Sequence, residues 1–315
     1  QESNVMAYYY VKNGGTATGD AGRYASQQTG SFAALGVGGY YPDLAAAIAA
    51  TTSPVADDFI LVSDLHSSAI STNRTITGLI PNVFFVVCVD DANIDAARTS
   101  GNRGIENGGI LTMSGALFSG LEFSSGNGLT WTSSNYLKDC LLRVTTNNDS
   151  VVTASGDGSI FTATNTEFHT NNITQRMTVS NAASIIVSGG SVSTTSAGLT
   201  NLFNGGFTGG GGVVLFSGVD ISSVAGTIIG LIGADAGADD MIDVRMDLCK
   251  IATGVAFTSE TFKSYNQRAL FTRCSDTSAT AEYQYHLHAF GGDVDDDATI
   301  YRNEDEPFTE SNQKI

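Results

Sequence analysis

The sequence predicts an all-β protein, a parallel β-helix in which short strands repeat along a solenoid. The first observation is a pattern between residues 116 and 279, where an apolar or small residue precedes a large apolar one by two places. The pairs are Leu121/Phe123, Leu142/Val144, Thr166/Phe168, Gly190/Val192 and Val219/Ile221. A period of two places both members on one face of a strand. The closing residues are 21, 24, 24 and 29 positions apart, a spacing typical of solenoid repeats that bury their faces by stacking.

The composition also favours many short strands. The 315 residues include 36 Gly but only 4 Pro, as expected for strands that need their N–H groups and are joined by tight turns. The net charge is −17, which argues against nucleic acid as a partner because polyanions are repelled. The sequence has no run of 18 apolar residues, so we expect no membrane-spanning helix.

The first 56 residues predict a strand, a loop and a capping helix. A strand is expected at 7–13, followed by a turn-rich excursion at 14–40 that we expect to be free to contact neighbours. Asp43 is a suitable N-cap for an Ala-rich helix in which Leu44 and Ile48 share one face. Such a helix would cover the open end of the first repeat. Another strand is expected at 57–64.

Three segments of this region, YYVKNGG, LAAAIAA and DDFILVSDLH, resemble the start of proteins of the pectate-lyase-like, single-stranded right-handed β-helix superfamily. The resemblance implies a right-handed parallel β-helix with an N-terminal helical cap. The superfamily includes polysaccharide lyases and hydrolases, bacteriophage tailspikes and bacteriophage decoration proteins, so the resemblance does not by itself select a function.

We therefore expect three regions. Residues 1–56 form the N-terminal strand, loop and capping helix, residues 57–290 form the parallel β-helix, and residues 291–315 form an acidic exit segment that begins a further C-terminal region. Within the β-helix, residues 90–109 are polar and Gly-rich and predict a long protruding loop. Residues 205–212 predict a wide turn, since no Lys-Ser or Lys-Thr follows the glycines as in a phosphate-binding loop.

The alternation also predicts an outward-facing column of Glu122, Arg143 and Glu167. One hypothesis is a solvent-exposed ladder of alternating charge. The other is a catalytic pair of glutamates two repeats apart, roughly 9.6 Å at the backbone, near the upper end of the separation in inverting glycosidases. We favour the ladder and expect no catalytic residues, because the column has no aromatic walls and Trp131 is the only tryptophan.

Two further site hypotheses are weaker. A polyuronate lyase would need clustered Asp for Ca²⁺ beside Arg or Lys, and Asp239, Asp240 and Arg245 are the only candidates of that kind. His286 and His288, at i and i+2 of one strand, could bind a metal together with Asp293 and Asp295. We favour a polar strand face followed by a solvated acidic turn, and therefore expect no cofactor, with Ca²⁺ as the alternative.

The four cysteines lack metal-ligand spacing and are too few for a disulfide scaffold. Cys249 and Cys274 are one repeat apart, which leaves two states open. We favour buried free thiols, and a bridge between stacked repeats is the alternative.

These observations predict a non-enzymatic bacteriophage virion structural protein, either a capsid decoration or a tail-associated component. The grounds are the resemblance, the lack of a catalytic constellation, the acidic composition and the absence of a signal peptide pattern. The alternatives are a polysaccharide-degrading β-helix enzyme, as a tailspike or a secreted lyase or hydrolase, and a glycan-binding adhesin, which would be extracellular. We expect a homotrimer bound to capsid or tail proteins. Ile300, Tyr301, Phe308 and Ile315 follow the last repeat, so we expect a neighbouring molecule or a further C-terminal part of the chain to cover them.

Overall fold

The computed structural model describes residues 6–50, 58–68, 73–76, 84–113, 115–145, 150–170, 177–179, 182–194, 201–205, 212–224, 227–232, 242–252, 256–258, 267–276, 282–289 and 299–302. Two compact units divide the chain, a first unit of Gln1–Arg143 and a second unit of Val144–Ile315, and each is described by itself. Strands account for 51% of the structure and helices for 9%, which confirms the all-β prediction.

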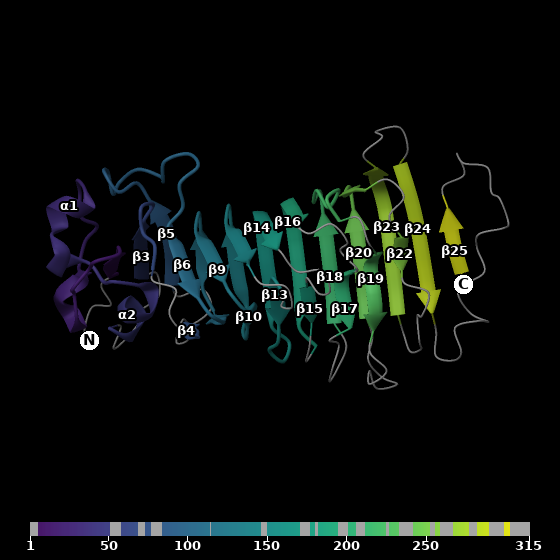
Figure 1. Ribbon diagram of the computed structural model, residues 1–315, viewed down its shortest axis with the longest axis horizontal. Helices are drawn as coiled ribbons and strands as arrows, with labels where there is room; N and C mark the ends of the chain where they lie inside the picture. The colour runs from purple at the N-terminus through teal and green to yellow at the C-terminus, as the bar shows by residue number, and fades with distance from the viewer. Residues whose placement is uncertain are drawn as a thin grey trace. The chain divides into compact units, whose positions relative to one another are not determined.

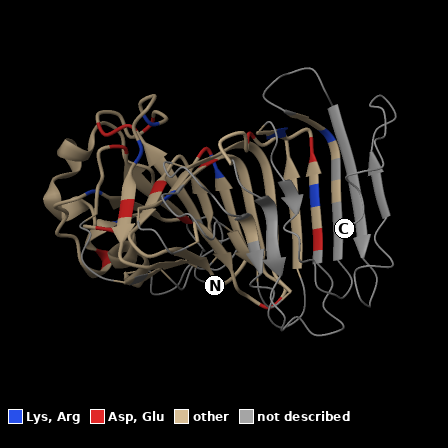
Figure 2. Cartoon of the chain, turned by 45° about the vertical axis from the view of Figure 1, so that its right-hand side comes forward, with Lys and Arg blue, Asp and Glu red and all other residues tan. Residues whose placement is uncertain are grey.

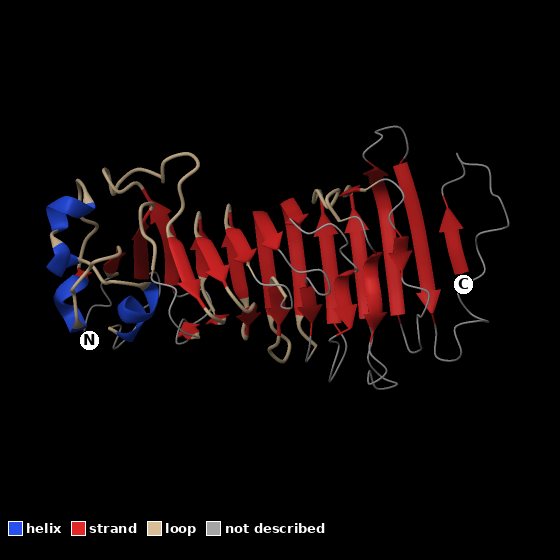
Figure 3. Cartoon of the chain, viewed as in Figure 1, coloured by secondary structure: helices blue, strands red, loops and turns tan. Residues whose placement is uncertain are grey.

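The first unit carries the helices described in the chain, seen in Figure 3 near the N-terminus. They are η1 (Gly19–Gly22), α1 (Phe32–Leu35), η2 (Val37–Gly39) and α2 (Leu44–Ala49). Its strands are β1 (Tyr8–Val11), β2 (Arg23–Tyr24), β3 (Asp58–Ser63), β4 (Arg74–Ile76), β5 (Phe84–Val89), β6 (Ile105–Gly108), β7 (Leu111–Met113), β8 (Leu117–Ser119), β9 (Glu122–Ser125), β10 (Leu129–Trp131), β11 (Asn135–Lys138) and β12 (Leu141–Val144).

Successive repeats of the first unit stack as parallel strands. One series runs β1, β3, β5, β8 and β11, with Tyr9, Ile60, Val86 and Phe118 in consecutive register. The short strands β6, β9 and β12 follow them at one side of the same sheet, and β4, β7 and β10 form a second sheet. Each complete repeat thus contributes three short segments, such as β8, β9 and β10.

The second unit repeats this arrangement (Figure 1). Its strands are β13 (Val152–Ala154), β14 (Ile160–Thr170), β15 (Met177–Val179), β16 (Ser184–Thr194), β17 (Asn201–Gly205), β18 (Gly212–Ser217), β19 (Thr227–Ile232), β20 (Ile242–Asp247), β21 (Lys250–Ile251), β22 (Ala256–Thr258), β23 (Gln267–Asp276), β24 (Glu282–Ala289) and β25 (Thr299–Arg302). The series β14, β16, β18, β20 and β23 is parallel, as is the series β13, β15, β17, β19 and β22. Parallel stacking in each unit fits a β-helix-like solenoid.

A corner residue with left-handed backbone precedes the inward-facing pair of each repeat. The φ angles are 74° at Gly120, 54° at Asp139, 48° at Asn165, 68° at Gly189, 65° at Gly218, 55° at Leu248 and 50° at Arg273. This conformation costs a side-chain-bearing residue roughly 1–2 kcal/mol, and Gly, Asn and Asp tolerate it best. The chain therefore turns sharply at one fixed point in each repeat.

The predicted inward residues are buried. Phe123 and Phe168 are 0% exposed, and Val144, Val192 and Ile221 are 1% exposed, while Phe168 lies opposite Val192 as predicted. In the first unit, however, Leu141 N–H donates to the Leu121 carbonyl at 2.9 Å. This bond places Leu141, not Arg143, opposite Glu122, so the predicted alignment of that repeat is wrong by two residues.

The predicted helix is present as α2, and its N-cap is Asp43. The Ala46 N–H donates to Asp43 Oδ1 at 2.8 Å, and Leu44, Ala47 and Ile48 are buried. Glu106 of β6 also binds the helix start, since its Oε1 accepts from the Leu44 N–H at 2.9 Å.

Contrary to expectation, the excursion at 14–40 packs against strands of its own unit. Phe32 and Tyr40 pack with Tyr10, Leu61 and Ile94 in one buried cluster. Tyr10 and Leu61 lie opposite each other in β1 and β3, so the excursion covers the outer face of those strands. Because their outward residues are large and apolar, burial by the excursion is strongly favourable.

The loop predicted at 90–109 is shorter, because residues 105–108 form β6. Polar contacts fix this loop to the residues that follow β1 and β3. The Asp64 carboxylate accepts from Asp91 N–H at 3.0 Å and Thr99 N–H at 2.9 Å, and Lys12 forms an ion pair with Asp91 at 2.7 Å.

The parallel series of the second unit is followed by two antiparallel strands. β24 pairs with β23, and β25 pairs with β24, with Ile300 opposite Leu287 and Tyr301 opposite His286. Residues 299–302 therefore pair with a strand of their own chain, whereas the sequence pattern left them no repeat to pack against. Phe308 and Ile315 lie outside the described residues.

Candidate functional site

The two candidate glutamates belong to different units, and the surroundings of each are described separately. Glu122 lies in the first unit, where Arg143 Nε donates to its Oε1 at 2.8 Å, and its side chain is only 13% exposed. Glu167 lies in the second unit, 41% exposed, with His169 Nε2 at 3.9 Å. The Glu122–Arg143 ion pair is the kind of contact that the ladder hypothesis predicts, although Arg143 reaches Glu122 diagonally.

Trp131 serves the core of the first unit. It is fully buried, and its ring meets Phe118 at a centroid distance of 6.3 Å and Phe123 at 5.8 Å, both edge to face. Such contacts stabilise a core, and a buried indole offers no face for stacking on a sugar.

The residues of the metal-site and lyase hypotheses are only partly described. His286 and His288 lie in β24, opposite Leu270 and Arg268 in backbone register. Asp293 and Asp295 lie outside the described residues, as do Asp239 and Asp240 of the lyase hypothesis. Within the ranges that the structure describes, no three His, Cys, Asp or Glu side chains are grouped so that they could hold a metal ion. No helix among these residues is long and apolar enough to cross a membrane.

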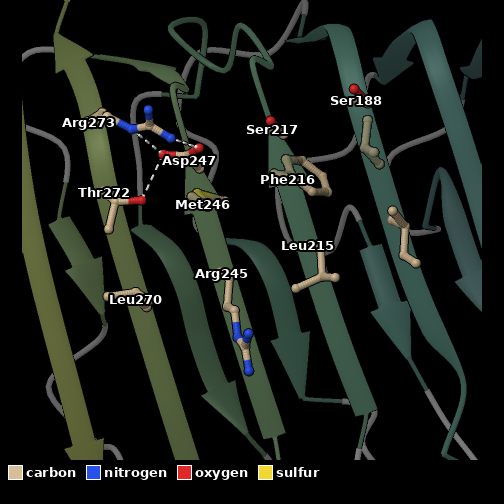
Figure 4. Close-up of a pocket in the computed structure, with 12 residues that line it drawn as sticks. Ser188, Leu215, Phe216, Ser217, Arg245, Met246, Asp247, Leu270, Thr272 and Arg273 are labelled. Carbon is tan, nitrogen blue, oxygen red and sulfur yellow. Dashed lines mark hydrogen bonds and ion pairs between the residues drawn. The ribbon is translucent and has the colours of Figure 1, made fainter.

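A hollow of about 460 Å³ lies on the outer face of β16, β18, β20 and β23 (Figure 4). We call it the sheet hollow. It is lined by two rows of outward-facing side chains and by the backbone between them. The first row comprises Ile186, Leu215, Arg245 and Leu270, and the second comprises Ser188, Ser217, Asp247 and Thr272.

Parallel register assembles these rows. Residues at equal positions on neighbouring strands lie side by side, and residues two apart on one strand share a face. The alternate residues Val187, Phe216 and Met246 are at most 2% exposed and form the core beneath. The hollow is thus the outside of a sheet whose inside is already fully packed.

The charged groups of the sheet hollow neutralise one another. Arg245 binds Asp243 through Nε at 2.9 Å and Nη2 at 2.6 Å, and the Asp243 side chain is only 3% exposed. The alternating acidic and basic residues along β20 can be followed in Figure 2.

Asp247 forms the second neutralised pair, visible in Figure 4. Arg273 donates to its carboxylate through Nε at 2.9 Å and also through Nη2. Thr272 Oγ1 donates to the same carboxylate at 2.8 Å. The hydrogen bonds from Arg273 and Thr272 lower the pKa of Asp247 below its usual value.

This arrangement is suited to binding and not to acid–base chemistry. The carboxylate of Asp247 is occupied by a guanidinium, and the lining residues include no His, Cys or Glu. The hydroxyls of Ser188, Ser217 and Thr272 therefore have no His or Glu base beside them within the hollow. What the surface offers is apolar contact next to paired charges.

The sheet hollow was not predicted from the sequence, although one pattern indicates it. Val213, Val214, Leu215 and Phe216 form a continuous apolar run, and residues 185–187 form another. Such runs are typical of strands covered on both faces, whereas the alternation described above predicts only the inward face. The charge pairs could not be predicted, because they depend on cross-strand register.

Comparison with known proteins gave no relative, since no protein family, no curated protein and no solved structure matches this chain.

Proposed function

We propose that this protein is a non-enzymatic structural component of a bacteriophage virion, as a capsid decoration or a tail-associated protein. In this proposal the chain is a right-handed parallel β-helix capped by α2, of the pectate-lyase-like superfamily. The parallel registers of both units support the architecture, and the resemblance of the N-terminal segments supports the superfamily and the virion setting.

The observation that carries a structural role is the sheet hollow. Leu215 and Leu270 present apolar side chains on an outward sheet face, and strands apolar on both faces are usually covered on both. The neighbouring carboxylates are already bound by Arg245 and Arg273. A surface with apolar residues and locally satisfied charge suits a protein neighbour better than it suits a reacting substrate.

We propose that this neighbour is a second copy of the chain, within a homotrimer. Each copy carries a net charge of −17, so copies repel one another unless they meet through a surface of low local charge. The sheet hollow is such a surface because its acidic and basic residues are paired. Cyclic symmetry is the usual way in which soluble chains bury a repeated patch.

Light scattering on the purified chain at micromolar concentration tests this assembly. We expect the mass of a trimer for the wild type and of a monomer for Leu215→Asp, because a carboxylate would be buried in the contact. Leu65→Asp is the matched control, since Leu65 is 60% exposed in the first unit, and it should remain trimeric. A monomeric wild type contradicts the homotrimer.

Two further measurements test the rest of the proposal. Copurification with phage particles at a fixed copy number would support a virion role, and absence from the particles of every candidate phage would count against it. Release of reducing sugar from bacterial polysaccharides, lost in Glu122→Gln or in Glu167→Gln, would establish the enzyme alternative instead.

A further inference from the structure

Cys249 and Cys274 lie opposite each other on neighbouring repeats of the second unit. The Ser275 N–H donates to the Cys249 carbonyl at 3.0 Å, and Lys250 is in register with Ser275. This register sets Cys249 directly beside Cys274. Paired strands are roughly 4.8 Å apart, which is within the Cα separation that a disulfide spans.

Both side chains point into the same interior. Cys249 and Cys274 are each 0% exposed, and each follows a left-handed corner residue, Leu248 or Arg273. Both are free thiols in this structure. Besides each other, their sulfurs contact backbone carbonyls, that of Asp247 at 3.5 Å from Cys249 and that of Thr272 at 3.5 Å from Cys274.

We propose that Cys249 and Cys274 are a redox pair that forms a disulfide cross-link between two adjacent repeats. This site is independent of the proposed structural function. The cross-link would close the loop of residues between the two cysteines and join β21 to β23.

The two sulfurs are also unequal as nucleophiles. The hydrogen bond from Cys274 lowers the pKa of Cys249, whereas that same bond, together with burial, raises the pKa of Cys274. In the exchange proposed here Cys249 is the attacking sulfur, since the thiolate is the attacking species.

The other two cysteines provide an internal contrast. Burial raises the pKa of Cys88 to about 12 and of Cys140 to about 11, so both remain protonated near neutral pH. Cys88 belongs to β5, and Cys140 follows β11, with the repeat of β8 and β9 between them. Two strand spacings, roughly 9.6 Å, exceed the reach of a disulfide.

The oxidation needs an external disulfide such as oxidised glutathione. The Cys249 thiolate attacks one sulfur of that disulfide, forming a mixed disulfide and releasing one glutathione thiolate. The Cys274 thiol then loses its proton and attacks the Cys249 sulfur, which releases the second glutathione. Two protein thiols are oxidised and one glutathione disulfide is reduced to two thiols. Because both protein sulfurs are buried, exchange proceeds through local opening of the strands.

The test is a peptide map of the full chain after exposure to oxidised glutathione or to dithiothreitol, followed by alkylation with N-ethylmaleimide and trypsin. Cleavage after Arg245, Lys250, Arg273 and Arg302 gives one fragment of 246–250 and one of 274–302. We expect these fragments to be joined in the oxidised sample, two hydrogen atoms lighter than their sum, and separate and alkylated in the reduced sample. Cys88 and Cys140 should be alkylated in both.

Matched variants decide the interpretation. Cys249→Ser and Cys274→Ser should give no linked peptide, and Cys140→Ser should give the wild-type result. The melting temperature should rise by several degrees on oxidation of the wild type and stay unchanged for Cys249→Ser. Recovery of both cysteines as alkylated thiols or as separate glutathione adducts, or a link that involves Cys88 or Cys140, would overturn the proposal.

Discussion

Left-handed corners are the strictest single-residue requirement of this fold. Gly120, Asp139, Asn165, Gly189 and Gly218 occupy such corners and belong to the residue types that accept a positive φ at least cost. Leu248 and Arg273 do so at φ angles of 55° and 50° without that advantage. The corner is therefore imposed by the packing of the repeat and not by local preference alone.

A comparison of two glycines distinguishes the cost of a positive φ from the cost of a steric clash. Gly190 and Gly218 both have positive φ, but a Cβ at Gly190 would lie 2.1 Å from the Thr166 carbonyl oxygen, whereas a Cβ at Gly218 would meet nothing within 4 Å. We expect Gly218→Ala to cost about 1 kcal/mol and Gly190→Ala about 3 kcal/mol or more. Urea unfolding measures both, and equal losses would show that the clash is relieved by a backbone shift.

Glu106 holds a helix and a loop together in the first unit. Its Oε1 accepts from the Leu44 N–H at 2.9 Å and lies 3.1 Å from His66 Nε2, and the side chains of Glu106 and His66 are fully buried. Glu106→Ala would leave these groups without their acceptor, at a cost of about 2–4 kcal/mol.

Two variants complete that unfolding measurement. Glu106→Gln should lose less stability than Glu106→Ala, because the amide keeps an acceptor oxygen. Glu122→Ala should cost less than about 1 kcal/mol, since its ion pair with Arg143 is partly solvated. A loss for Glu106→Ala no larger than for Glu122→Ala would contradict the role of the buried contact.

At the scale of the strand, inward positions supply the core. Phe168 of β14 is 0% exposed and lies opposite Val192, and its ring is 6.5 Å from that of Phe161. We expect Phe168→Ala to cost about 3–5 kcal/mol. Ile160 of the same strand is 42% exposed, so Ile160→Ala should cost about 1 kcal/mol or less. Calorimetry of both variants checks the difference. Comparable losses of stability would mean that burial does not determine how much each side chain contributes.

The outer strand faces divide into covered and uncovered parts. The excursion at 14–40 buries Tyr10 of β1 and Leu61 of β3. In the sheet hollow, Leu215 and Leu270 are only partly buried by the described part of the chain. Outward-facing apolar residues are thus buried by the chain itself in the first unit. In the second unit, according to our proposal, another molecule buries them.

For the molecule as a whole, acidity makes the pairing of charges important. The chain has 32 acidic and 15 basic residues, so most carboxylates cannot have a basic partner. Asp243 and Asp247 do have a basic partner, and their Arg partners lie on the same sheet face. In our proposal, copies of this acidic protein associate through the sheet hollow because its surface is locally neutral.

The same pairing sets a pH dependence. The pKa of Asp247 is lower in the folded protein than in the unfolded chain because Arg273 and Thr272 donate to its carboxylate. Its contribution to stability is therefore present above the unfolded value, roughly 3.9, and is lost as the pH falls through the folded value. Between pH 5 and pH 2, Asp247→Asn should lose less stability than the wild type loses.

Denaturant unfolding at a series of pH values measures this difference. Asp157→Asn is the control, since Asp157 is exposed, and it should follow the wild type. Identical pH profiles for Asp247→Asn and the wild type would show that the Arg273 contact contributes nothing to stability.

The sequence by itself determined the period of two, the spacing of the repeats, the helix after Asp43 and the burial of Phe123, Phe168, Val192 and Ile221. These properties follow from local alternation and capping, which do not depend on which strands become neighbours. The sequence also indicates the corners, since Gly, Asn and Asp recur there, although no corner was predicted.

Only the tertiary structure decided which residues meet across strands. The alternation aligns Arg143 with Glu122, but Leu141 occupies that place, because a shift of two residues leaves the alternating pattern unchanged. The antiparallel return of β24, the covering of β1 by the excursion, and the meeting of Asp247 with Arg273 likewise depend on turn lengths and on which strands become neighbours. Alternation fixes which face a side chain occupies, whereas its partner is fixed by strand register, which the apolar pattern specifies only to within a multiple of two residues.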